Sequence, residues 1–189
     1  MNAFYINLDR RTDRRAEFEQ GSIVAERFPA IEHTVPAIGC TRSHLEVLKL
    51  ARERQYPCVG VFEDDFQCLV PQDTLHTILQ SFPDDYDVVM LDYYILQSEP
   101  YNDGFDRVLE AQAGSAYVVH SRFYDTLIKT YEEAVELFEQ HPHCHWLYIN
   151  DQYWKRLQPH SRWYMSRVRI GRQRPGYSDL KQAVLENEY

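Results

Sequence analysis

The sequence of 189 residues contains no apolar run long enough to cross a membrane. A spanning helix needs about 20 consecutive apolar residues, and no stretch of the chain approaches that length. The first residues, 1–11, are apolar and then basic, which is the reverse of the order in a secretory signal. We therefore expect a cytoplasmic protein with at most peripheral contact to a membrane.

Cysteines are few and widely spaced. Cys40, Cys58, Cys68 and Cys144 form no Cys-x-x-Cys pair. Their spacing fits neither a zinc site nor a dense disulfide framework. Most of them are expected to be buried thiols.

The chain also lacks an excess of basic residues, since 20 Lys and Arg face 29 Asp and Glu for a net charge of −9. A nucleic-acid-binding surface needs dominant positive charge, so we expect no nucleic-acid partner. Glycine (7) and proline (9) are scarce, and no linker or internal repeat is present. A hydrophobic content of 44% excludes a disordered chain, and the length suits one domain.

Short apolar runs alternate with helical patterns along the chain. Strands are predicted at residues 3–8, 59–62, 87–91, 116–119 and 163–170, and helices at 13–20, 43–55, 72–81 and 121–140. Residues 35–40 and the segment with His141, His143 and His145 are predicted loops, and a short helical piece follows Asp151. This alternation predicts an α/β fold with a mostly parallel central sheet and helices on both faces.

The triplet Glu63-Asp64-Asp65 follows the apolar strand at 59–62. Adjacent carboxylates repel one another, and a divalent ion such as Mg²⁺ or Mn²⁺ with oxygen ligands would offset that repulsion. Open α/β sheets bind ligands beyond the carboxyl ends of their strands. The triplet is therefore a candidate metal site, and the alternative is a solvated acidic turn.

Two arginine-rich segments are candidate anion sites. Residues 9–15 hold four arginines directly after the first strand, and residues 162–174 hold five arginines and no acid. The planar guanidinium matches phosphate oxygens. The alternatives are an ion-paired helix start for the first segment and a charge-protected edge strand for the second.

Ser43 and Asp151 each have two interpretations. Ser43, with Glu46 three residues later, has the spacing of a capping box, while the backbone amides of the same helix start would also hold an anion. Asp151 is either a helix N-cap or a general base. The sequence leaves both pairs of alternatives open.

Five blocks together resemble glycosyltransferase family 25, which includes lipooligosaccharide β-galactosyltransferases and collagen hydroxylysine galactosyltransferases. In chain order the blocks are residues 5–14 (YINLDRRTDR), Gly39-Cys40 with Ser43-His44, residues 61–65 (VFEDD), residues 114–119 (GSAYVV), and residues 173–175 (QRP) with Ser178-Asp179. The resemblance spans nearly the whole chain. It implies a single GT-A-type domain over residues 1–189, a UDP-galactose or UDP-glucose donor, Mn²⁺ or Mg²⁺, and inversion at the anomeric carbon.

The resemblance also implies roles for residues. Asp65 is expected to bind the metal, with Glu63 and Asp179 as further ligands. The expected donor-binding residues are Asn7, Leu8, Arg11, Arg14, Gly39, Ser43, His44, Glu63, Asp64, Gly114, Ser115, Arg174 and Ser178. Asp151 is the preferred base for the acceptor hydroxyl, and Asp92 is the second choice. Residues 1–92 would bind donor and metal, and residues 93–189 the acceptor, with the basic C-terminal segment closing over the phosphates.

The acceptor side departs from the family pattern. The chain is short for the family, and Asp92-Tyr93-Tyr94 stands where a glycine-containing loop is expected. A glycan, a lipooligosaccharide and a hydroxylysine all remain candidate acceptors. Two other functions are also considered, a metal-dependent phosphohydrolase and a non-catalytic nucleotide-sugar or glycan-binding module. The first lacks its usual Asp-x-Asp-x-Thr motif, because Phe66 follows Asp65.

Overall fold

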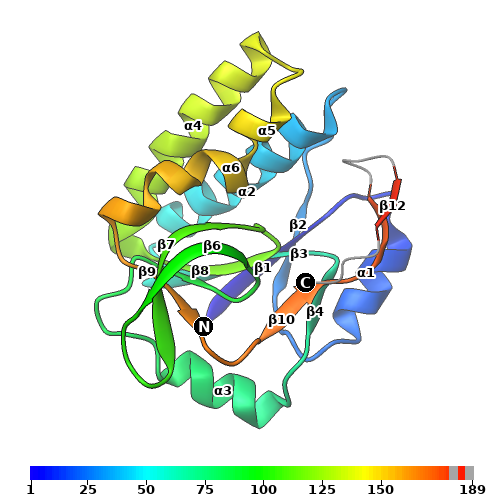
Figure 1. Ribbon diagram of the computed structural model, residues 1–189. Coiled ribbons are helices and arrows are strands. Elements are labelled where there is room, and N and C mark those ends of the chain that lie inside the picture. The colour runs from blue at the N-terminus through cyan, green and yellow to red at the C-terminus, as the bar shows by residue number, and fades with distance from the viewer. Residues whose placement is uncertain (179–182, 186–189) are drawn as a thin grey trace.

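The computed structural model describes residues 1–178 and 183–185, which form an α/β fold around a central sheet (Figure 1). The sheet has eight strands in the order β2-β1-β3-β8-β5-β9-β7-β6. Their bounds are β1 (Asn2–Asn7), β2 (Glu26–Pro29), β3 (Cys58–Glu63), β5 (Val88–Met90), β6 (Tyr94–Pro100), β7 (Phe105–Gln112), β8 (Ala116–His120) and β9 (Trp163–Ser166). When the pairings are followed across this sheet, β8 and β7 run against the other six strands. The predicted mostly parallel sheet is confirmed.

Two short antiparallel ladders lie beside this sheet. Strand β4 (Phe66–Cys68) pairs with β10 (Gly171–Gln173), and β11 (Gly176–Ser178) pairs with β12 (Ala183–Leu185). The first ladder carries the C-terminal region to the end of β3, where the Arg174 amide donates to the Asp65 carbonyl at 2.7 Å. Residues more than a hundred positions apart in sequence therefore meet at one edge of the sheet.

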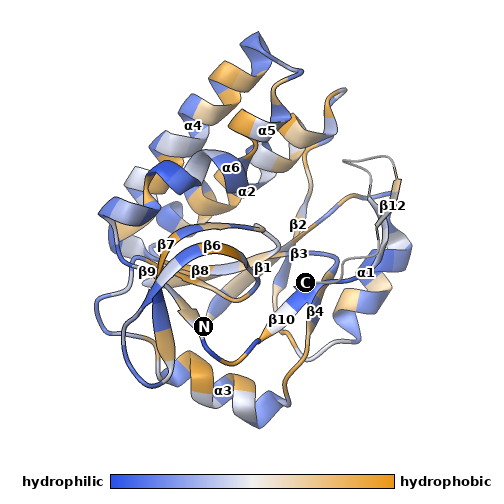
Figure 2. Ribbon diagram, in the orientation of Figure 1, coloured by the Kyte–Doolittle hydropathy of each residue, from blue (hydrophilic) through white to orange (hydrophobic). Residues whose placement is uncertain are grey.

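Helices cover both faces of the sheet, as predicted. Helices α2 (Pro36–Glu53) and α4 (Tyr124–Gln140) pack on one face, and α1 (Thr12–Glu19) and α3 (Gln72–Gln80) on the other. Alternation along β1 explains how one strand serves both layers, because Phe4 and Ile6 join the α2 and α4 core while Tyr5 joins the opposite core. Hydrophobic and hydrophilic residues alternate around α3 and α4 in Figure 2, as expected of helices with one buried side.

Short helical pieces connect α4 to β9. They are α5 (His145–Tyr148), α6 (Asn150–Tyr153) and two 3₁₀ turns, η2 (Trp154–Arg156) and η3 (Gln158–His160), while η1 (Ser121–Phe123) precedes α4. Helix α6 contacts α2 and α4, and Figure 1 shows α5 and α6 on the α2 side of the sheet. This connection places Asp151 beside the first turns of α2, a position that chain order alone does not reveal.

The start of α2 corrects one prediction. The helix begins at Pro36, not at Ser43, so residues 36–40 are helical rather than a loop. Proline suits the first helical position, because its fixed φ is already helical and its missing N–H is not needed there. Ser43 is not a cap: its hydroxyl donates to the Gly39 carbonyl (2.7 Å) and accepts from the Ile31 amide (2.8 Å).

Several elements were not predicted, and the late strand is shorter than expected. Strands β2, β4, β6, β7 and β10 to β12 had no prediction, and β9 ends at Ser166 rather than at residue 170. Most β6 residues are exposed, so that strand lacks the apolar run by which a strand is recognised. The four cysteines are half-buried free thiols rather than buried ones. No helix in the described ranges has the length and hydropathy that crossing a bilayer requires.

Candidate functional site

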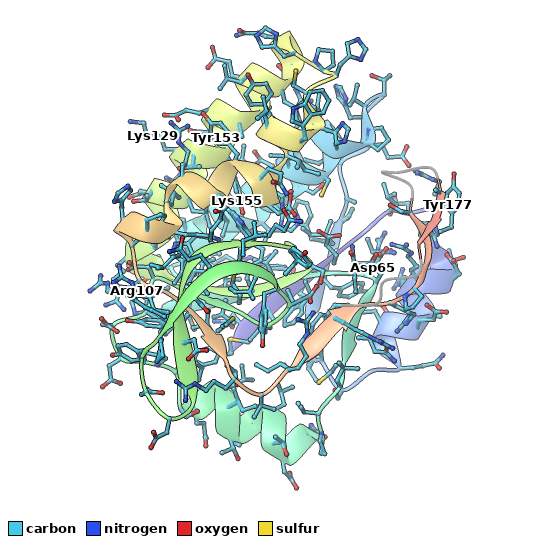
Figure 3. The ribbon with its side chains drawn as sticks, in the orientation of Figure 1. Asp65, Arg107, Lys129, Tyr153, Lys155 and Tyr177 are labelled. Atoms are coloured by element: carbon cyan, nitrogen blue, oxygen red, sulfur yellow. The ribbon has the colours of Figure 1, made fainter. Side chains whose placement is uncertain are left out.

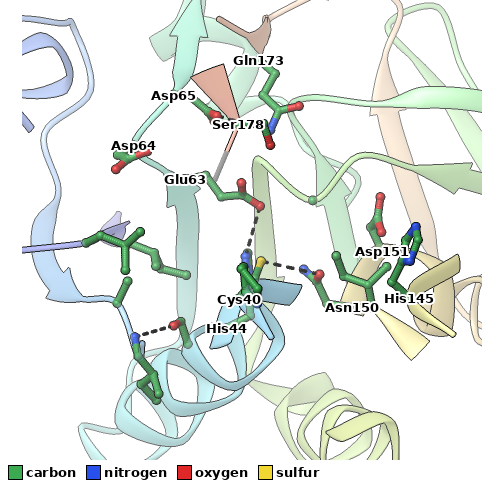
Figure 4. A pocket seen from close by; sticks show the side chains of 18 of the residues that line it. Cys40, His44, Glu63, Asp64, Asp65, His145, Asn150, Asp151, Gln173 and Ser178 are labelled. Carbon is green, nitrogen blue, oxygen red and sulfur yellow. Dashed lines mark hydrogen bonds and ion pairs between the residues drawn. The ribbon is translucent and has the colours of Figure 1, made fainter. Parts of the chain in front are cut away.

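The carboxyl ends of β1 and β3 open into a cavity of about 990 Å³ (Figure 4). This volume lies at the upper end of the range for small-molecule sites. Its walls come from the segments after β1, β2 and β3, the first turns of α1 and α2, the two residues after β7, and α5 with α6. The predicted site residues that line it are Leu8, Arg11, Arg14, Ser43, His44, Glu63, Asp64, Asp65, Gly114, Asp151 and Ser178. The structure thus gathers most of the predicted site into one cavity.

Arg14, near the start of α1, connects two members of the acidic triplet. Its Nη1 donates to Asp64 Oδ1 at 3.0 Å and to Asp65 Oδ2 at 2.9 Å, and its Nη2 donates to the Tyr177 carbonyl at 2.6 Å. Figure 3 shows Asp65 and Tyr177 on the same side of the molecule. Asp64 also accepts from the Asn7 amide at 2.7 Å. One guanidinium therefore partly neutralises two buried carboxylates and fixes their orientation.

Asp65 keeps one acceptor atom without a partner. Its Oδ1 is buried and has no hydrogen bond within the described part of the chain. Burial, and then the charge of Glu63, raise the pKa of Asp65 to about 8, and Arg14 opposes that rise. A buried carboxylate oxygen with no donor is costly, and a divalent ion would supply the missing partner. The residues present therefore fit Mg²⁺ or Mn²⁺ at Asp65, with Glu63 close by.

His44 connects the triplet to helix α2. Its Nε2 lies 3.3 Å from Glu63 Oε1, and its Nδ1 lies 2.8 Å from the Tyr117 hydroxyl. Cys40, one turn earlier, places its Sγ 4.0 Å from Asn150 Oδ1. Figure 4 shows Cys40 and His44 next to Glu63. Cys40 was not among the predicted site residues, although its position four residues before His44 puts both on one face of a helix.

Asp151 lies on the α6 side of the cavity, and Figure 4 places it and His145 across from Asp64. It is the second residue of α6, whose N-cap is Ile149, so the N-cap interpretation is wrong. The Ala113 amide donates to its Oδ2 at 3.1 Å. Burial raises the pKa of Asp151, and this hydrogen bond opposes the rise. Its position and its raised pKa are those of a candidate base.

Gly114 explains how Asp151 and Asn150 come so close to the sheet. A Cβ at position 114 would lie 2.9 Å from Asn150 Nδ2 and 3.6 Å from Asp151 Cβ. Any side chain there would displace α6 from the cavity wall. The missing side chain of Gly114 therefore lets helix α6 pack close to the end of β7.

Four predicted site residues lie beneath the cavity rather than on its wall. Asn7 binds Asp64, and its Oδ1 accepts from Arg27 at 3.0 Å. Ser115 donates to Asp92 Oδ2 at 2.6 Å in the core. Gly39 is buried in the first part of α2. Asp92 has 0% of its surface exposed and also accepts from Arg169 at 2.9 Å, so this ion pair places it away from the cavity.

The arginines of the C-terminal block do not line the cavity. Four of the five pair with carboxylates elsewhere, Arg162 with Asp87, Arg167 with Asp106, Arg169 with Asp92 and Arg174 with Glu17. Gln173 and Ser178 reach the cavity instead. The prediction that these arginines close over a diphosphate therefore has no support in the described residues, and Asp179 lies outside them. The arginines that do line the cavity are Arg10, Arg11 and Arg14.

Sequence reasoning missed the aromatic rim of the cavity. Trp146 in α5 is 58% exposed and Tyr94 at the start of β6 is 43% exposed, and both line the cavity. His145, predicted in a loop, lies in α5 and lines it too. An isolated four-residue helix and an exposed edge strand have no periodic signal that a sequence reading could use.

Comparisons with known proteins establish the fold. No protein-family model and no curated protein sequence matches the chain. Among solved structures, a glycosyltransferase involved in the glycosylation of the major capsid of PBCV-1 matches with a TM-score of 0.62 at 9% identity, over 96% of this chain and 95% of that one. A mannose-1-phosphate geranyltransferase from Thermus thermophilus matches with a TM-score of 0.49 at 10% identity, over 90% of this chain and 58% of that one. The first match confirms the GT-A-type fold, whereas membership of family 25 stays a prediction.

Proposed function

We propose that the chain is an inverting, metal-dependent glycosyltransferase that moves galactose or glucose from a UDP-sugar to a hydroxyl of an acceptor. The observation that carries this proposal is the acidic triplet at the end of β3, which faces a large cavity together with Arg14. The cavity holds an unpartnered buried carboxylate oxygen of Asp65. The likeness to a solved glycosyltransferase supports the fold that this activity needs.

Asp65 and Glu63 would hold Mn²⁺ or Mg²⁺, and Asp179 stays a predicted further ligand. When bound, the ion stabilises the negative charge that develops on the departing diphosphate. Arg11 and Arg14 would bind the phosphate oxygens, since their guanidinium groups line the same cavity. Asn7 acts on this site indirectly, because it holds Asp64 in place.

Leu8 and Ile31 give the donor end of the cavity an apolar wall, which suits the flat face of a nucleobase. Ser43 fixes this wall, because its hydroxyl accepts from the Ile31 amide. Gly39 contributes by its size: an added Cβ would lie 2.4 Å from the Ile31 carbonyl oxygen, so any side chain would push the wall outward. Arg174 and Ser178 stay predicted donor residues.

Asp151 would act on the acceptor. The acceptor oxygen forms a bond to the anomeric carbon as the bond to UDP breaks, UDP leaves with the electron pair, and Asp151 takes the hydroxyl proton. Attack from the face opposite UDP inverts the anomeric carbon. Trp146 and Tyr94 are exposed aromatic residues that line the cavity, and aromatic side chains suit sugar rings. They favour a glycan or lipooligosaccharide acceptor, with hydroxylysine as the further candidate.

The test is a screen of UDP-sugars for Mn²⁺-dependent donor hydrolysis, followed by a panel of acceptors. Asp65→Asn should lose metal-dependent UDP binding, whereas Asp84→Asn, which changes an exposed acid outside the cavity, should not. Unchanged UDP binding and turnover in Asp65→Asn would refute the metal assignment. Release of phosphate from simple esters without sugar transfer would favour a phosphohydrolase. UDP binding without donor hydrolysis or sugar transfer would favour a non-catalytic binding module.

Asp151→Asn separates the base from the donor site. UDP should bind this variant as tightly as it binds the unchanged chain, because Asp151 faces the acceptor side. Transfer should fall by a factor of about 10²–10⁴, which is the usual contribution of a general base. Transfer at the original rate would exclude Asp151 as the base.

A further inference from the structure

Three donor atoms of different chemistry meet beside the acidic triplet. The sulfur of Cys40, a ring nitrogen of His44 and a carboxylate oxygen of Glu63 all lie within 4.8 Å of one another. Cys40 and His44 come from successive turns of α2, and Glu63 ends β3. The spacing of cysteines along the chain predicted no zinc site, but this set draws its ligands from a helix and a strand.

The spacing of these atoms is close to that of a tetrahedral metal site. Zn²⁺ binds nitrogen and oxygen at about 2.0–2.2 Å, which places two such ligands about 3.3 Å apart. His44 Nε2 and Glu63 Oε1 are 3.3 Å apart. A sulfur ligand at about 2.3 Å from the ion would lie about 3.6 Å from each of them. Cys40 Sγ lies within 4.8 Å of a donor atom on each of these two residues, so the sulfur would move toward them when an ion binds.

A second layer of contacts holds the imidazole. The His44 side chain is fully buried, and its Nδ1 lies 2.8 Å from the Tyr117 hydroxyl. Tyr131 donates to that same hydroxyl at 3.4 Å. Metal-binding histidines usually have a partner on the ring nitrogen that does not bind the ion, which fixes the orientation and the tautomer of the ring. His44 has this partner, and its Nε2 faces Glu63.

The charges around Cys40 favour a cation. Cys40 lines the same cavity as four carboxylates, those of Glu63, Asp64, Asp65 and Asp151. The same carboxylates that disfavour a free thiolate attract a divalent ion. An ion bound there replaces the thiol proton, which leaves to solvent.

We propose that Cys40, His44 and Glu63 form a transition-metal site that prefers Zn²⁺. Thiolate and imidazole ligands select Zn²⁺ over Mg²⁺ and Mn²⁺, which favour oxygen. The fourth position faces the cavity and would take water or an oxygen of a ligand. This site differs from the Asp65 site in its donors but shares Glu63 with it, and it does not require the chain to transfer sugar.

The alternative is a hydrogen-bonded His44–Glu63 pair without an ion, and the tautomer of His44 distinguishes the two. Without an ion, Nε2 carries the proton and donates to Glu63, while Tyr117 donates to Nδ1. With an ion on Nε2, the proton moves to Nδ1, which donates to Tyr117. The ¹⁵N imidazole spectrum of His44 should therefore change tautomer when Zn²⁺ is added. The Nε2–H tautomer at saturating Zn²⁺ would overturn the proposal.

Co²⁺ provides the direct test, because a bound thiolate gives Co²⁺ an intense charge-transfer absorption that carboxylates do not give. Protein stripped with a chelator should develop this absorption when Co²⁺ is added and lose it when Zn²⁺ displaces the probe. Cys40→Ser should abolish it. Cys68→Ser, a matched change of a half-buried cysteine outside the cavity, should leave it intact. Absence of the band in the unchanged chain, or its persistence in Cys40→Ser, would overturn the proposal.

Two further variants separate this site from the proposed donor site. Asp65→Asn should keep the Co²⁺ band while it loses metal-dependent UDP binding. Tyr117→Phe should lower Zn²⁺ affinity by about 10–100-fold, the usual effect of removing such a partner, with thermal unfolding as the check that the variant folds. Loss of the band in a folded Asp65→Asn variant would show that the ion belongs to the acidic triplet and would overturn the separate site. A chain that develops the Co²⁺ band but shows no UDP-sugar activity would refute the proposed function and leave the Zn²⁺ site in place.

Discussion

Replacing Arg14 with methionine tests the charge balance of the cavity. Methionine keeps much of the apolar side-chain length and removes the guanidinium that binds both Asp64 and Asp65. The side chains of the three residues are 16%, 9% and 10% exposed, so this is a largely buried cluster. Removing one partner of a buried ion pair costs about 3–5 kcal/mol. Asp65 offsets part of that loss by taking up a proton, since its pKa is already raised.

We therefore expect Arg14→Met to lower the free energy of unfolding by about 3 kcal/mol in the absence of metal. For a chain of this size, that change corresponds to a fall in Tm of about 6–12 °C. The loss should be smaller at pH 5 than at pH 8, because protonated carboxylates need no cation. Urea unfolding in the presence of a chelator, at both pH values, measures these quantities.

Arg15→Met is the matched control. Arg15 is the next residue of α1, and it pairs with Glu19 at 3.0 Å in an exposed contact. Exposed pairs contribute about 0.2–1 kcal/mol, so this variant should change stability little. Equal losses for Arg14→Met and Arg15→Met would refute the reasoning. So would additivity in a cycle with Asp65→Asn, because two residues in direct contact should show a coupling energy of at least about 0.5 kcal/mol.

Three further predictions concern the other parts of the site. If Asp151 is the base, the rate of transfer should rise with pH as this carboxyl loses its proton. Because its pKa is raised, the acid limb of the pH–rate profile should lie above the pH expected of an ordinary aspartate. An acid limb near pH 4 would contradict this assignment. Burial raises the pKa of Asp92, so the folded chain binds a proton that the unfolded chain releases. The unchanged chain should therefore lose stability relative to Asp92→Asn as the pH rises above about 4. A difference in unfolding free energy between the two proteins that does not change with pH would contradict this. Gly39→Ala should cost about 1–3 kcal/mol in urea unfolding, because its Cβ would lie 2.4 Å from the Ile31 carbonyl oxygen, whereas Gly104→Ala, whose nearest atom is at 3.8 Å, should cost less than about 0.5 kcal/mol.

The predictable part of the fold rests on local pattern. The strands at the centre of the sheet are short apolar runs, and the helix after residue 121 has a strong apolar stripe, so their residues indicate their structure without help from the rest of the chain. The hairpin of β6 and β7 could not be found this way, because its outer strand is exposed and its residues pair with partners up to 18 positions away in the sequence.

Helix α2 shows how two valid start signals can compete. Proline is favoured at the first position of a helix and serine at the N-cap, so Pro36 and Ser43 are both candidate helix starts. The sequence does not show which of the two begins the helix. The structure selects Pro36, because the Ser43 hydroxyl has a tertiary role in accepting from the Ile31 amide. That contact joins residues 12 positions apart, which a reading of local pattern does not consider.

The position of a candidate site residue was predictable where the end of a strand in the sequence also opens onto the cavity. The acidic triplet follows its strand directly, so placing it at the sheet edge needed only the strand. Asp92 also follows a buried strand, β5, yet it lies in the core because Arg169, 77 residues later, pairs with it. Long-range ion pairs of this kind decide whether a polar residue at a strand end faces a cavity, and no spacing rule reveals them.

The net charge of −9 conceals how the arginines are used. In the C-terminal block, Arg162, Arg167, Arg169 and Arg174 pair with carboxylates outside the cavity. Anion binding would therefore depend on the first segment, where Arg14 already binds two aspartates. A diphosphate near Arg14 would compete with those aspartates unless a cation offset their charge. The affinity for UDP should consequently be strongly linked to the divalent ion, and equal affinities with Mn²⁺ and with chelator would show that Arg14 serves the fold alone.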